Sequence, residues 1–159
     1  MKAGKYFVCD PCYLFHGKSE NALGWIPFLN LNNYFQPRDV AAKGGIFTIT
    51  WKGVEYEFGV ANTAYGDGCY ESSFPGEPKF GVDAGMISVV PVEMFEEVIG
   101  AGVSASDYAK SENLLIVDLD EFTFDPGVGH GEIRVGDYVI ETGYRDTEYD
   151  EYEYEDIHG

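Results

Sequence analysis

The sequence has few basic residues for its length. Ten lysines and arginines stand against 28 aspartates and glutamates among 159 residues, so the formal net charge is −18. Residues 145–159 hold seven of the acids and one base; the remainder keeps 21 acids and nine bases, a net charge of −12. Because a negative field repels phosphate backbones and anionic membrane surfaces, binding to nucleic acid or to a membrane is disfavoured. The same field favours a basic protein as partner.

Long apolar runs and cysteines are also scarce. No apolar stretch approaches the roughly 20 residues that a membrane-spanning helix needs. There are three cysteines, an odd number, and the apolar run 6–8 after the first lysines is too short for the core of a secretory signal. We therefore expect a soluble protein of the cytoplasm, with reduced thiols.

The chain is well supplied with apolar and aromatic residues, at 45% and 16%, which is typical of a folded domain. We expect one globular domain over residues 1–143, followed by an acidic, tyrosine-rich tail over residues 144–159. Like-charge repulsion should keep this tail extended in isolation.

Short strand patterns dominate the predicted domain. Alternating or β-branched runs joined by glycine turns predict hairpins over 46–60 and 132–142, a strand, tight turn and buried strand over 79–90, and a strand over 113–119 with 121–124 as its neighbour. Residues 5–9 predict a strand that continues, after a turn at Asp10-Pro11, through 12–15. Helices are predicted over 27–35, 91–100 and 104–111. The predicted fold class is α+β, with a curved, mainly antiparallel sheet or partly open barrel and two or three short helices.

Acidic and thiol-bearing turns form one candidate ligand pocket. Asp67 lies between two glycines, and Asp83 lies in an apolar run, where a carboxylate must be paired, hydrogen-bonded or shifted in pKa. If these turns converge, the pocket would be lined by Asp10, Cys12, Tyr65, Asp67, Cys69 and Asp83. The alternative, which we favour, is that the aspartates bind the amides of their own turns.

The motif Cys9-Asp10-Pro11-Cys12 has the C-x-x-C spacing of redox sites, and with His16 and Cys69 it would supply four zinc ligands. It lacks both a preceding βα unit and a second C-x-x-C pair, so we favour buried structural thiols and expect neither metal nor cofactor. A cysteine nucleophile would need a histidine base, and the histidines lie in weak contexts. No catalytic residue is assigned, and a small enzyme, such as a two-carboxylate hydrolase, is the less favoured alternative.

The tail is the candidate partner-binding segment. Each tyrosine can pack against a partner and each acid can meet a lysine or arginine, although a merely solvating tail is the simpler interpretation. The residues concerned are Tyr149, Asp150, Glu151, Tyr152, Glu153, Tyr154 and Glu155.

Three motifs carry a family resemblance: Asp10-Pro11-Cys12-Tyr13, Tyr65-Gly66-Asp67-Gly68 and Val82-Asp83-Ala84-Gly85. Together they resemble a group of small uncharacterised proteins of phages and bacteria that open with a DPCY segment and carry a YGDG turn before a VDAG strand. The resemblance spans residues 6–95, implies a phage or mobile-element origin, and brings no activity with it. With the charge, it leads us to expect an acidic protein-interaction module, such as a phage-encoded inhibitor of a host defence or nucleic-acid-handling protein, acting in the host cytoplasm.

Overall fold

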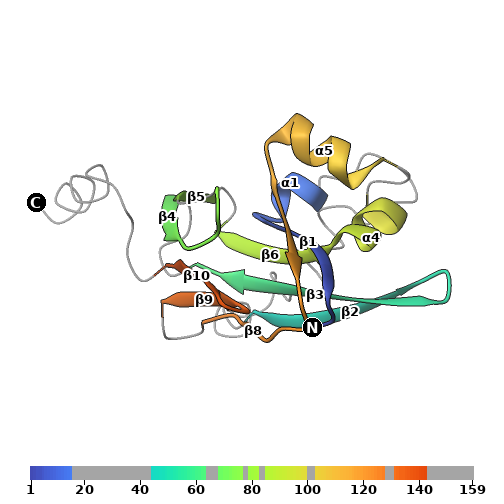
Figure 1. Ribbon diagram of the computed structural model, residues 1–159. Coiled ribbons are helices and arrows are strands. Elements are labelled where there is room, and N and C mark those ends of the chain that lie inside the picture. The colour runs from blue at the N-terminus through green and yellow to red at the C-terminus, as the bar shows by residue number, and fades with distance from the viewer. Residues whose placement is uncertain are drawn as a thin grey trace, which may run out of the picture.

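The computed structural model describes residues 1–15, 44–63, 68–76, 79–82, 85–99, 103–127 and 131–142. Within these ranges the strands form two antiparallel sheets of five strands each, and short helices lie together on one side of the first sheet (Figure 1). Neither sheet closes into a barrel. The predicted fold class, mainly antiparallel strands with a few short helices, is confirmed.

The first sheet has the strand order β2-β3-β6-β1-β7. Its central strands β6 and β1 are buried on both faces, which explains why their sequences are almost continuously apolar. The strands are β1 (Gly4–Cys9), β2 (Gly45–Trp51), β3 (Val54–Asn62), β6 (Met86–Pro91) and β7 (Leu115–Leu119).

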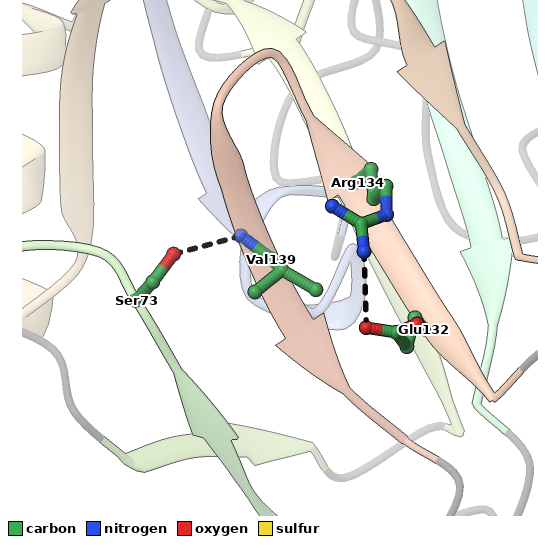
Figure 2. A network of polar contacts seen from close by, with 4 residues as sticks. All are labelled: Ser73, Glu132, Arg134 and Val139. Atoms are coloured by element: carbon green, nitrogen blue, oxygen red, sulfur yellow. Dashed lines mark hydrogen bonds and ion pairs between the residues drawn. The ribbon is translucent and has the colours of Figure 1, made fainter.

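The second sheet has the order β5-β4-β10-β9-β8. At its centre, the Val139 N–H donates to Ser73 Oγ at 2.8 Å, and the adjacent strand carries an exposed ion pair between Arg134 and Glu132 at 3.2 Å (Figure 2). The strands are β4 (Gly68–Ser72), β5 (Lys79–Val82), β8 (Phe124–Asp125), β9 (Glu132–Val135) and β10 (Tyr138–Glu141).

Two apolar cores divide the described part of the chain into three layers. Side chains such as Val8 and Val89 on the first sheet meet Tyr70 and Ile133 of the second sheet. On the opposite face of the first sheet, Phe7 and its neighbours pack against the helices. The alternation of a strand thus sends consecutive residues of β1 into different cores.

The helical layer contains α1 (Cys12–Phe15), α4 (Val92–Met94), the π-helix η1 (Phe95–Ile99) and α5 (Ala105–Glu112). Glu96 Oε2 accepts a hydrogen bond from the Ala105 N–H at 2.8 Å, so η1 supplies a cap to the first turn of α5. Asn113 ends α5 in the left-handed conformation. The helices predicted over 91–100 and 104–111 correspond to α4–η1 and α5, whereas the one predicted over 27–35 lies outside the described residues.

Two local predictions, for residues 12–15 and 121–124, are wrong. Residues 12–15 form helix α1 and not a strand, because the Asp10 side chain caps the turn that Pro11 opens. The strand and buried strand predicted over 79–90 are confirmed as β5 and β6, although β5 belongs to the second sheet and β6 to the first. Strand β8 is confined to Phe124–Asp125 and pairs with β9, so the chain changes sheets after β7 as well.

Among the described residues, no helix has the length and apolar character needed to cross a bilayer.

Candidate functional site

The described residues of the predicted ligand pocket lie on elements of different sheets and share no hollow. Asp10 is fully buried after β1, and its Oδ1 accepts the main-chain N–H of Cys12 at 2.9 Å. Cys69 is exposed on β4 of the other sheet, where its register partner is Gly81. Asp10 and Cys12 are therefore brought together, but through the backbone of a turn. The other three predicted residues, Tyr65, Asp67 and Asp83, lie outside the described part of the chain.

Cys9 occupies the last position of β1, beside Asp10. It is buried, and Ser88 Oγ donates to its carbonyl oxygen at 2.9 Å across the β1–β6 pair. Burial raises the pKa of the Cys9 thiol well above its ordinary value, and the neighbouring Asp10 and Cys12 raise this pKa further. The thiol stays protonated at neutral pH, which disfavours both nucleophilic attack and metal binding.

A hollow of about 320 Å³ opens beside the end of β1. Its wall includes Cys9, Tyr13 and Lys79 but neither Asp10, Cys12 nor Cys69. Within the described ranges, no group of three or more histidine, cysteine or acidic side chains is arranged to hold a metal ion.

Another hollow in the described part of the chain has a volume of about 910 Å³ and is strongly acidic. We call it the acidic hollow. Its charged lining consists of Lys2, Glu57, Asp118, Asp120, Glu121 and Asp137. Each of these side chains is exposed, so the five carboxylates face solvent.

The acidic hollow forms where the chain passes from one sheet to the other. Asp118 and Asp120 flank the end of β7, Asp137 lies in the β9–β10 turn, and Glu57 comes from the exposed face of β3. Its lining also contains apolar side chains, among them Leu119 and Phe122, which are each 9% exposed. The Phe122 N–H donates to the Met1 carbonyl at 3.0 Å, which holds the first residues along the rim.

Sequence reasoning missed this hollow. Its acids come from three separate segments of the sequence, at Glu57, 118–121 and Asp137. Within its own segment, each acid has the sequence pattern of an ordinary solvent-exposed residue. The surplus of acids in residues 1–144 was visible, but its concentration at one place was not. The predicted partner-binding residues of the tail, 149–155, lie outside the described residues.

Comparison of the chain with protein-family models, with curated proteins and with solved structures finds no match in any of the three.

Proposed function

We propose that this chain is an acidic protein-binding module that docks onto the basic surface of a partner protein. The observation that carries the proposal is the acidic hollow, in which five carboxylates face one Lys2 side chain and the N-terminal residue. A concave site lined by one sign of charge focuses the electric field and raises the rate at which oppositely charged molecules arrive.

The apolar side chains of the lining add a second element of recognition. Leu119 and Phe122 form a small apolar surface surrounded by acids. An interface of this kind suits a basic patch with an apolar centre, since charges at the rim guide association while apolar contact stabilises the complex. We extend the proposal to the tail, whose tyrosines and acids would continue the same negative surface.

The charge pattern and the resemblance to phage proteins together suggest the kind of partner. A surface that is negative over an extended area competes with polyphosphates for basic clefts. The partner we propose is a host defence or nucleic-acid-handling protein, which the chain would block in the host cytoplasm.

The test is affinity capture from host lysate with the full-length chain at low salt, followed by measurement of the dissociation constant for the recovered partner. Neutralising the hollow with Asp118→Asn and Asp120→Asn should weaken binding about tenfold or more, which corresponds to about 1.4 kcal/mol. A matched control, Asp107→Asn with Glu112→Gln on α5, removes the same charge elsewhere and should change the constant less than about threefold. Binding should weaken steeply as salt screens the charges.

A third variant addresses the tail, with Asp150→Asn, Glu151→Gln, Glu153→Gln and Glu155→Gln in the full chain. A large loss here, with none for the hollow variant, would assign binding to the tail instead of the hollow. Recovery of no basic protein at low salt would refute the proposed function altogether.

A further inference from the structure

A third hollow, which shares no lining residue with the acidic hollow, lies between the tip of the β2–β3 hairpin and the helical layer. Its volume is about 400 Å³, and we call it the hairpin pocket. The hairpin contributes Trp51, Lys52, Val54 and Tyr56, and α4–η1 contributes Glu93, Glu96 and Glu97. In the ribbon view the hairpin extends away from the body of the first sheet, with α4 on the side where the helices lie (Figure 1).

The strand register places the two aromatic rings on one face of the hairpin. Trp51 pairs with Val54, and Tyr56 pairs with Ile49, which lies two positions before Trp51 on the same face of β2. Trp51 and Tyr56 are therefore diagonal neighbours across the hairpin. Both side chains are half-buried. Part of each aromatic ring is therefore not covered by the packing of the domain and faces the pocket.

The helix places carboxylates opposite these rings. Glu96 is engaged with the first turn of α5, but Glu93 and Glu97 are exposed and make no hydrogen bond or ion pair within the described residues. Their charges reach the ring of Tyr56: burial, followed by Glu97 and Glu93, raises the pKa of its hydroxyl above the ordinary value. The pocket therefore combines aromatic faces with three carboxylates against one lysine, Lys52.

The indole nitrogen of Trp51 supplies an independent observation. Within the described part of the chain, it is the one buried side-chain nitrogen or oxygen without a hydrogen-bond partner. A buried donor left without an acceptor destabilises the folded state. The same nitrogen is buried from solvent, so a carbonyl oxygen of a bound peptide would reach it only if the Trp51 side chain turned toward the pocket.

We propose that the hairpin pocket binds an arginine side chain presented by a peptide segment of another protein. The guanidinium group stacks on aromatic faces and pairs with carboxylates, so Trp51, Tyr56, Glu93 and Glu97 offer what it requires. Arginine suits the site better than lysine because its planar group satisfies both interactions at once. The chain's own Lys52 is exposed at the pocket and acts as a weak competitor.

This site goes beyond the proposed function, because it is a pocket for one side chain and shares no lining residue with the acidic hollow. Its test needs no natural partner. The probe is the blocked peptide acetyl-Gly-Arg-Gly-amide, titrated into the ¹⁵N-labelled full-length chain while the Trp51 indole N–H resonance, assigned by its loss in Trp51→Phe, is followed by NMR.

The arginine peptide should shift this resonance with a dissociation constant on the order of millimolar, as expected for a single buried side chain. The peptide with citrulline, which has the same shape without the charge, should bind at least about tenfold more weakly. Glu93→Gln with Glu97→Gln should weaken arginine binding by a similar factor, and Lys52→Gln should strengthen it. Asp118→Asn with Asp120→Asn is the matched control and should leave binding within about twofold.

Equal binding of the citrulline peptide, or equal binding by the Glu93→Gln and Glu97→Gln variant, would overturn the inference in favour of a purely apolar pocket. Absence of any shift at about 50 mM peptide would overturn it outright. Failure of the lysate capture with success of this titration would reject the proposed function and keep the pocket, and the reverse result would do the opposite.

Discussion

The ring of Phe124, in the second sheet, lies directly against Gly59, in the first. A Cβ atom at residue 59 would come within 2.9 Å of Cδ2 and Cε2 of that ring, which is closer than carbon atoms approach in folded proteins. Because glycine has no Cβ atom, the two sheets can approach each other closely at residue 59.

The substitution Gly59→Ala should lower the free energy of unfolding by about 1–3 kcal/mol, because the ring must move in a packed core. The measurement is urea denaturation of the full chain. Gly81→Ala is the control, since Gly81 also lies on a strand but a Cβ atom there would meet nothing within 4 Å beyond its own chain neighbours. A Gly59→Ala variant as stable as the unsubstituted chain would contradict the close contact between Gly59 and Phe124, and an equal loss for Gly81→Ala would show that the effect is not specific to this contact.

Asp10 tests the choice between a turn residue and a ligand-binding residue. Asp10→Ala removes the acceptor of the Cys12 N–H and should lower the free energy of unfolding by about 1–2 kcal/mol, whereas Asp10→Asn keeps an acceptor and should cost less. Asp118→Ala, at an exposed position, should stay within about 0.5 kcal/mol of the unsubstituted chain. If Asp10→Ala were as stable as the unsubstituted chain, the structural role would be wrong.

The cysteines should differ sharply in reactivity. Cys69 is exposed, whereas Cys9 is buried and has a raised pKa, so iodoacetamide at neutral pH should modify Cys69 at least about a hundredfold faster than Cys9. Mass spectrometry of peptides from time points gives the two rates. In strong denaturant the difference should disappear, and its persistence there would mean that local sequence, not burial, sets the reactivity.

Stability should fall at alkaline pH. Burial is the main cause that raises the pKa of Cys9 and of Tyr6, Tyr56 and Tyr108 in the folded chain. The folded state therefore holds these protons more tightly than the unfolded state does. The resulting stability is complete below the unfolded pKa values, which are 9.0 for cysteine and 10.0 for tyrosine, and is lost as the pH rises through the folded values.

Denaturation curves between about pH 8 and pH 10 should show this decline, at up to about 1.4 kcal/mol per pH unit from Cys9 once its unfolded form ionises. The control Cys9→Ala removes that contribution and should make the slope shallower. An unchanged slope in this variant would contradict the assignment to Cys9.

The parts of the fold that the sequence predicts correctly depend on local signals. The β2–β3 hairpin follows from Lys52-Gly53, where both residues adopt positive φ, and the β9–β10 hairpin from Gly136-Asp137. The division into two sheets could not be predicted in the same way, since the strand pattern of residues 79–90 is compatible with pairing inside one sheet or with a crossing between two. Helix α1 did carry a signal, because Asp10 before Pro11 is a common way to begin a helix.

Neither the acidic hollow nor the hairpin pocket could be predicted from the sequence. Glu57, Asp118 and Asp137 each look like solvated acids in their own segments, and only the meeting of the two sheets brings them together. Trp51 and Glu93 are likewise separated by several strands. The overall charge was readable, because it requires no knowledge of which residues become neighbours.

Strand β2 lies at the border of its sheet, with β3 as its one neighbour among the described strands, and none of its residues Gly45–Trp51 carries a charge. Such an edge strand can pair with the same strand of another molecule and start the growth of an oligomer. The net charge of −18 opposes this, because every molecule repels every other. The negative charge thus also keeps the molecules apart in solution. Self-association should set in as the pH falls toward about 4, where the carboxylates take up protons.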